Sequence, residues 1–241
     1  MKVLAAYGCS HSGTGYGDSW NKILAERMGM KHYRRSAPGS NLGQHLDKLN
    51  YDLQNEQIDL VVLQLSQFFR LTLGMSELED MDHEYRPTED GFRFGNTGAF
   101  TYAGAEDDEV FDQCFGLKLS DEYKGIQKFF ARYILPTTWM RRFCNQQLYT
   151  FISLCKQYNK PLYIFSWYEP IKARYVMPEW HHMLEGVGFW EQSTDGYEGW
   201  FHENKIPCVP NDGHYSTSAH QRLVDEVLYD KVNTFYNGSD V

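Results

Sequence analysis

The sequence has few of the features that mark disulfide-rich, zinc-binding or membrane proteins. Its 241 residues include five cysteines, an odd number without a C-x-x-C pair, which argues against a disulfide framework and a zinc ribbon. No stretch approaches the roughly 20 apolar residues that a membrane-spanning helix requires. Met1-Lys2 leads directly into a short apolar run instead of a signal peptide. We therefore expect a cytoplasmic protein that has no membrane partner.

Basic clusters are also scarce. The formal net charge is −9 at pH 7, and the adjacent arginine pairs are Arg34-Arg35 and Arg141-Arg142. Because binding to phosphates needs a clustered basic surface, this composition disfavours nucleic acid as a partner. His181-His182 and His202 do not form a recognisable ligand spacing with a carboxylate, so we expect no metal site. No glycine-rich stretch has the register of a dinucleotide or phosphate loop.

The composition otherwise resembles that of an ordinary globular domain. Hydrophobic residues make up 42% and charged residues 23% of the chain, and its length suits one domain with its own core. Aromatic residues reach 16%, a share that favours both tight packing and contact with a ligand.

Hydrophobic patterns predict strands that alternate with helices. Residues 58–65 form a nearly continuous apolar run, typical of a central parallel strand that is covered on both faces. Shorter strands are expected at 3–7, 31–35 and 162–166, and helices at about 18–29, 41–54, 137–158 and 217–235. This order predicts right-handed βαβ units and a parallel sheet. Cys144 and Cys155 lie eleven residues apart, which places both on one helix face and favours a core position.

Two long segments lack sustained periodicity, at about 68–120 and 167–204. Both follow predicted strands, and long irregular segments in compact domains often serve as lids or binding loops. We expect a single domain over residues 1–241, in which these insertions form the walls of a cleft.

Ser10 directly follows the first strand in a glycine-rich turn. The carboxyl ends of parallel strands are where open α/β folds bind ligands. A serine nucleophile needs an imidazole base within hydrogen-bond reach, itself oriented by a third group. Among the histidines, His214 combines a nearby carboxylate, Asp212, with a glycine turn and a following helix. Other roles stay open, because Ser10 could cap the next helix and His214 could lie in a surface turn.

The motif Gly8-Cys9-Ser10-His11-Ser12 resembles the first block, G-D-S-x-S, of the SGNH (GDSL-like) hydrolases, with Cys9 in place of the acid. Pro38-Gly39-Ser40-Asn41 resembles the second block, and Asp212-Gly213-His214 the last. The resemblance implies a flavodoxin-like three-layer α/β sandwich with a central parallel sheet, in which Ser10, His214 and Asp212 are catalytic. It also implies that the Gly39 N–H helps to bind the oxyanion, although a plain turn glycine is the alternative.

The third block, G-x-N-D, is missing, because Ser66-Gln67-Phe68-Phe69-Arg70 follows the strand at 58–65. Gln64 or Gln67 could supply the amide that the family takes from asparagine. The resemblance implies a serine esterase or deacetylase that needs no cofactor and acts on a small-molecule or carbohydrate ester, with O-acetyl groups as one candidate. The alternative is a catalytically degenerate SGNH-fold protein that binds carbohydrate or builds a virion. The motifs also resemble those of phage and marine-bacterial members, and a phage-encoded protein would be associated with the virion. The oligomeric state stays open.

Overall fold

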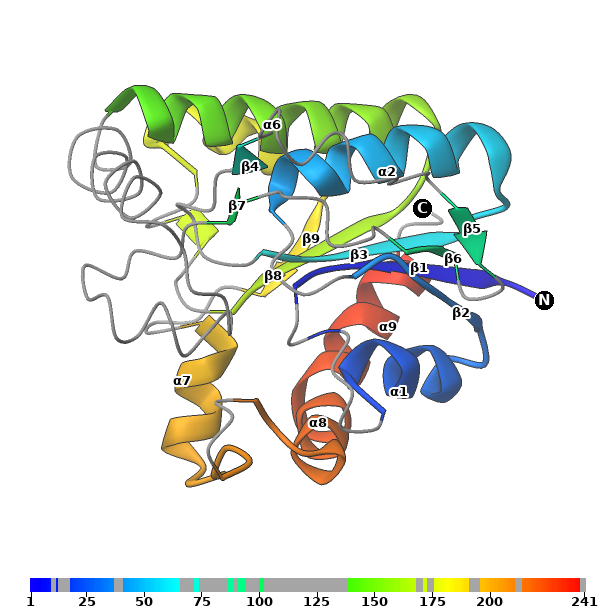
Figure 1. Ribbon diagram of the computed structural model, residues 1–241, viewed down its shortest axis with the longest axis vertical. Helices are drawn as coiled ribbons and strands as arrows, with labels where there is room; N and C mark the ends of the chain where they lie inside the picture. The colour runs from blue at the N-terminus through cyan, green and yellow to red at the C-terminus, as the bar shows by residue number, and fades with distance from the viewer. Residues whose placement is uncertain are drawn as a thin grey trace.

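Five parallel strands form the centre of the computed structural model (Figure 1). In spatial order they are β2 (Lys31–Arg34), β1 (Val3–Tyr7), β3 (Leu60–Leu65), β8 (Leu162–Ser166) and β9 (Gly188–Trp190). Every neighbouring pair in this sheet is parallel. All six residues of the middle strand β3 are buried, which explains its continuous apolar sequence.

The structure describes residues 1–9, 12, 18–36, 41–65, 72–73, 86–88, 91–93, 100–101, 138–167, 171–172, 176–190, 196–210 and 214–238. For residues 72–73, 86–88, 91–93 and 100–101, and for Met140 and Gly196, it describes the backbone alone.

Helices cover both faces of the sheet (Figure 1). One face carries α2 (Leu42–Asn55) and α6 (Thr138–Gln157). The other carries α1 (Trp20–Arg27), α8 (Thr217–Leu223) and α9 (Tyr229–Gly238), the last two joined by a π-helical turn, η5 (Val224–Leu228). The predicted three-layer α/β sandwich is confirmed.

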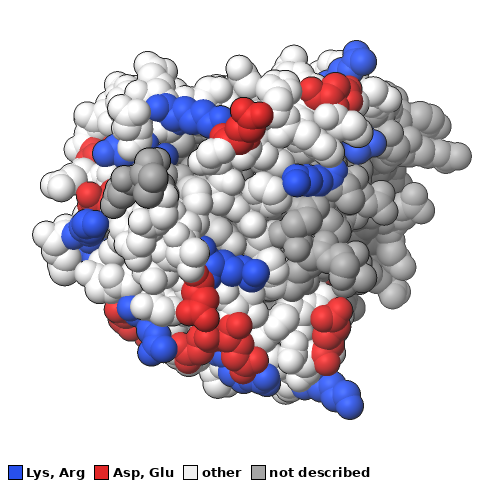
Figure 2. Space-filling view, turned by 180° about the vertical axis from the view of Figure 1, so that it is seen from behind, with Lys and Arg blue, Asp and Glu red and all other residues white. Residues whose placement is uncertain are grey.

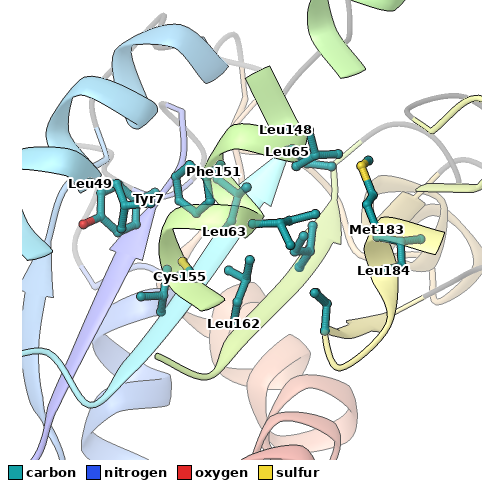
Figure 3. Packing of buried hydrophobic residues seen from close by; sticks show 14 of the residues in the cluster. Tyr7, Leu49, Leu63, Leu65, Leu148, Phe151, Cys155, Leu162, Met183 and Leu184 are labelled. Carbon is teal, nitrogen blue, oxygen red and sulfur yellow. The ribbon is translucent and has the colours of Figure 1, made fainter. Parts of the chain in front are cut away.

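The core beneath α2 and α6 is built from aliphatic side chains around the aromatic pair Tyr7 and Phe151 (Figure 3). The rings of this pair meet edge to face, with centroids 5.5 Å apart. Cys144 and Cys155 are both buried in this core, as their spacing predicts. Burial raises the pKa of the Cys155 thiol to about 12, so the thiol stays neutral and packs as a small hydrophobic group.

The core on the opposite face is dominated by aromatic rings. Trp20 of α1 meets Phe165 of β8 edge to face, with centroids 4.8 Å apart. Phe201 and Tyr215 stack at 3.9 Å, and Trp167 contacts Tyr215 at 5.6 Å. Much of the high aromatic content therefore serves packing.

The expectation of an irregular segment at 167–204 is wrong for its described residues. Most of them form the 3₁₀ helix η4 (Pro178–Leu184), the edge strand β9 and α7 (Gly196–Glu203). A strand of three residues is too short to show alternation. Gly188 in β9 is required by packing, because a Cβ atom there would lie 2.5 Å from the Tyr163 ring and 2.6 Å from the Phe235 ring.

The other predicted insertion, 68–120, is described only at two short antiparallel pairs. β4 (Thr72–Leu73) pairs with β7 (Phe100–Thr101), and β5 (Arg86–Thr88) pairs with β6 (Gly91–Arg93). The remaining residues of this segment lie outside the described ranges. The division into one domain with two insertions therefore stays a prediction.

The described surface mixes both signs of charge. On the face shown in Figure 2, acidic and basic side chains lie among uncharged ones. Ion pairs one helical turn apart include Lys22 with Asp18 and Arg222 with Glu226, each at 2.7 Å. Among the described helices, none is long and apolar enough to cross a membrane.

Candidate active site

The carboxyl end of β1 leads directly into the motif that contains Ser10. Gly8 and Cys9 follow the strand, and the Cys9 side chain is completely buried. The backbone N–H of Ser12 donates to the carbonyl of Cys9 at 2.9 Å, a contact that closes a turn from Cys9 to Ser12. Ser10 itself lies outside the described residues.

Gln64, in the central strand β3, bonds to both sides of this turn. Its Oε1 accepts hydrogen bonds from the backbone N–H of Cys9, at 3.4 Å, and from the Ser12 hydroxyl. Its Nε2 donates to the Cys9 sulfur at 3.5 Å. Gln64 is completely buried, so these bonds replace the water that its amide loses on folding.

Ser12 is held from the other side as well. The indole N–H of Trp20 donates to the Ser12 hydroxyl at 2.9 Å. The Ser12 carbonyl accepts from the hydroxyl of Ser36 at 3.0 Å, from that of Ser19 at 3.0 Å and from the amide of Asn21. Ser36 comes soon after β2, so the network joins the carboxyl ends of β1, β2 and β3.

Position 8 has no room for a side chain, because Ser12 and Gln64 lie close to its backbone. A Cβ atom at this position would lie 2.3 Å from the Ser12 hydroxyl oxygen and 2.7 Å from Oε1 of Gln64. Real Cβ atoms essentially never approach other atoms this closely, so the hydrogen bonds described above require a glycine at position 8.

A buried ionic cluster surrounds Arg35, three residues before the second motif. Arg35 Nε donates to Asp52 at 2.8 Å, and the Tyr7 hydroxyl donates to the same carboxylate at 2.7 Å. Lys48 Nζ donates to the Arg35 carbonyl at 2.9 Å. Burial, together with the positive charge of Arg35, lowers the pKa of Lys48 to about 7. Arg35 is therefore anchored shortly before residues 37–40, which lie outside the described ranges.

His214 is half-buried and lies next to residues that reach the same edge of the sheet. Its carbonyl accepts from the backbone N–H of Val209 at 2.7 Å. The neighbouring Tyr215 packs on Trp167, and the backbone N–H of Trp167 donates to the carbonyl of Leu65 at 2.9 Å. Leu65 is the last residue of β3, so this chain of contacts links His214 to the strand ends.

No protein-family model matches the sequence, and no curated protein matches it. Solved structures do match it. The crystal structure of TesA aligns over 97% of this chain and 99% of its own, with a TM-score of 0.50 and 12% identity. The psychrotrophic esterase EstA from Pseudoalteromonas sp. aligns over 98% of this chain and 100% of its own, with a TM-score of 0.50 and 11% identity. AlinE4, an SGNH-hydrolase family esterase, aligns over 97% and 96%, with a TM-score of 0.44 and 10% identity.

The chain shares its fold with TesA and with the esterase EstA. At these identities the likeness concerns the fold, so an activity has to be argued from the residues of the site.

Two of the six residues predicted for an SGNH site are described. Gln64 bonds to Cys9 and Ser12, and His214 is half-buried and directly precedes Tyr215 of the aromatic core. The other four, Ser10, Gly39, Gln67 and Asp212, lie outside the described residues. Sequence reasoning missed Ser12, Trp20 and Asn21, which hold the turn. Only the serine in the last position of the G-D-S-x-S pattern could have drawn attention to Ser12.

Within the described ranges, no group of three or more His, Cys, Asp or Glu side chains could hold a metal ion. His181 instead uses its Nε2 to contact the carbonyls of Lys172 and Val176, each at 3.3 Å. His182 is exposed and contacts the carbonyl of Glu179 through Nδ1 at 3.2 Å.

Proposed function

We propose that the protein hydrolyses carboxylic esters by acyl transfer, with Ser10 as the nucleophile, His214 as the base and Asp212 as the group that orients the imidazole. The observation that carries this proposal is the pair of bonds that fixes Cys9 and Ser12, the described residues of the motif that contains Ser10. Cys9 and Ser12, on either side of Ser10, are hydrogen-bonded to Gln64 at the carboxyl end of the central strand. Tyr215, next to His214, packs against Trp167, which bonds to the end of the same strand.

The reaction proceeds in two halves. The Ser10 hydroxyl attacks the ester carbonyl while His214 takes its proton, and the imidazolium then protonates the departing alcohol. Water, activated by His214, attacks the acyl-serine, releases the acid and returns the proton to Ser10. The backbone N–H groups of Ser10 and Gly39, together with the Gln67 amide, are the proposed donors to the oxyanion in both halves.

O-acetylated carbohydrate is the proposed substrate class. The two segments predicted to line the cleft are rich in Tyr, Trp and Phe, whose faces suit contact with sugars. In the described part of these segments, Trp180, Trp190 and Trp200 pack against the two cores while staying partly exposed.

The test is hydrolysis of p-nitrophenyl acetate and of acetylated xylo-oligosaccharides by the wild type, Ser10→Ala and His214→Gln. Loss of the nucleophile or the base is expected to lower kcat by about 1,000-fold or more, because only binding and oxyanion effects remain. His182→Gln, an exposed histidine on η4, is the matched control and should keep wild-type activity. A Ser10→Ala enzyme as active as the wild type would assign the hydrolysis to another group.

The second candidate function is a catalytically degenerate SGNH-fold protein that binds carbohydrate. It is favoured by the replacement of G-x-N-D with Ser66-Gln67-Phe68-Phe69 and by Cys9 in place of the usual acid. This candidate predicts no hydrolysis of either substrate by the wild type. It also predicts a calorimetric binding isotherm for the same oligosaccharides that Ser10→Ala leaves unchanged.

A further inference from the structure

We infer that Gln64 is a positioning residue, which holds the turn around Ser10 and does not donate to the oxyanion. The inference rests on the proposed function, because it gives Gln64 a role in placing the proposed nucleophile. The sequence makes Gln64 a candidate for the oxyanion amide that the family takes from asparagine, and we assign it the positioning role instead.

The hydrogen bonds of Gln64 turn its amide toward Cys9 and Ser12. An oxyanion donor must point its N–H at the reaction centre, at about 2.7–3.1 Å from the developing charge. Gln64 is completely buried, so its side chain is not exposed to a bound substrate. Oε1 accepts from Cys9 and Ser12, while Nε2 faces the Cys9 sulfur.

The position of Gln64 in β3 also calls for such a role. The other five residues of this strand are leucine or valine, and all six are buried. A polar amide in a central strand destabilises the fold unless its hydrogen bonds are satisfied. Here Oε1 accepts from Cys9 and Ser12 and one amide N–H donates to the Cys9 sulfur, so the bonds of this buried glutamine tie these two residues to the central strand.

The hydrogen bonds around Gln64 form a chain in which the donors point toward its Oε1. The Trp20 indole donates to the Ser12 hydroxyl, which in turn donates to Oε1 of Gln64. The Cys9 N–H donates to the same oxygen from the other side of Ser10. In a buried, water-free setting such chains polarise one another and act as a unit. Each side of the turn is therefore tied to the same atom of the central strand.

Loss of the Gln64 hydrogen bonds is expected to change the rate of the reaction and not the affinity for the substrate. Loosening the turn would let the Ser10 hydroxyl drift from its line of attack, and a displacement of about 1 Å can cost about 100-fold in rate. Substrate binding by the cleft walls would be unaffected. We therefore expect variants of Gln64 to lower kcat and to leave KM nearly unchanged.

The first experiment compares Gln64→Met, Ser12→Ala and the double variant with p-nitrophenyl acetate. Methionine has nearly the length of glutamine but makes no amide hydrogen bonds. Each single variant should lower kcat by about 10- to 100-fold with KM within about twofold of the wild type. The double variant should be little worse than either, because both substitutions break one unit. Gln54→Met, an exposed glutamine on α2 bonded to Asn50, is the matched control.

The second experiment does not depend on activity. The Cys9 side chain is completely buried, so iodoacetamide can reach its thiol only when the surrounding structure opens. The rate of its alkylation, mapped by peptide mass spectrometry, therefore reports how firmly Cys9 is held. Gln64→Met should speed the alkylation of Cys9 by about 10-fold or more, since opening becomes easier by the energy of the lost hydrogen bonds. Cys155, on the buried face of α6, should keep its wild-type rate and so reports that the fold is intact.

The outcomes separate this inference from the proposed function. If Ser10→Ala keeps activity but Cys9 becomes reactive in Gln64→Met, the proposed nucleophile is wrong and the turn-holding role stands. The inference is overturned if Gln64→Met keeps wild-type kcat and wild-type Cys9 alkylation. It is also overturned if Gln64→Met lowers kcat while Ser12→Ala does not and Cys9 stays sealed in both, because that pattern belongs to an oxyanion donor.

Discussion

His220 is a titratable side chain buried in α8, with 1% of its surface exposed. It contacts the Phe201 ring edge to face, with centroids 6.3 Å apart. Burial, with the nearby His214 as the second cause, lowers the pKa of His220 to about 4. The residue therefore stays neutral at pH values where an exposed histidine is already charged.

This shift predicts a loss of stability in mild acid. In the unfolded chain His220 binds a proton below its ordinary pKa of about 6.5, whereas in the folded chain it does so only near 4. Between these values the unfolded state holds more protons, so the free energy of unfolding falls as the pH falls, by at most about 1.4 kcal/mol per pH unit. His220→Phe should flatten the dependence, measured by urea unfolding between pH 6.5 and 4.5.

The exposed His182→Gln is the control for this measurement, and its slope should match that of the wild type. An unchanged slope in His220→Phe would mean that His220 is protonated equally in both states, contrary to its burial. His32, whose pKa burial also lowers to about 4, contributes a further slope that both variants retain.

The part of the site that the sequence predicts depends on how far apart along the chain the interacting residues lie. Gly8, Ser10 and Ser12 stand together in one motif, so their local pattern is visible in the sequence. Gln64 is visible as a polar residue in an apolar strand, but its partners come from 52 and 55 residues away along the chain. Its role depends on how closely the turn approaches β3, and no local pattern encodes that approach.

The start of α2 gives a prediction about a single helix. Asn41 caps this helix through a reciprocal pair of bonds, since its side chain accepts from the Gln44 N–H at 3.0 Å and its own N–H donates to the Gln44 side chain at 3.1 Å. Asn41→Ala should lower the free energy of unfolding by about 1 kcal/mol or more, whereas Asn41→Ser, which can still cap, should lose only a fraction of this. Thermal unfolding of both variants measures the difference. Equal loss in the two would show that the cap does not stabilise α2.

Helices and strands were predictable where their apolar pattern is long. The 20 residues of α6 carry a helical period and the six of β3 form a continuous apolar run, and both elements lie within their predicted ranges. β9 has only three residues, and α7 contains Gly196 and Gly199 in eight, which weakens its helix propensity. Both form because the sheet edge and the aromatic core supply contacts that a short segment cannot supply alone.

The two cores share one sheet, and this arrangement bears on how the protein unfolds. Alternate side chains of β3 enter opposite cores, so Val62 packs beneath α1 and α8 while Leu63 packs beneath α2 and α6. Neither helical layer has an apolar surface to cover once the sheet is lost. We therefore expect both layers to unfold in one transition.

Pulsed hydrogen exchange in increasing urea, read by peptide mass spectrometry, tests this expectation on both layers at once. Peptides from α6 and from α8 should lose protection at the same urea concentration. Leu63→Ala removes packing from the α2 and α6 side alone and should lower the free energy of unfolding by about 2–5 kcal/mol. The midpoint of α8 should nevertheless move together with that of α6, because the strand that carries Leu63 also carries Val62. If α6 loses protection first and α8 keeps its wild-type midpoint, the layers are separate units and the sheet does not couple them.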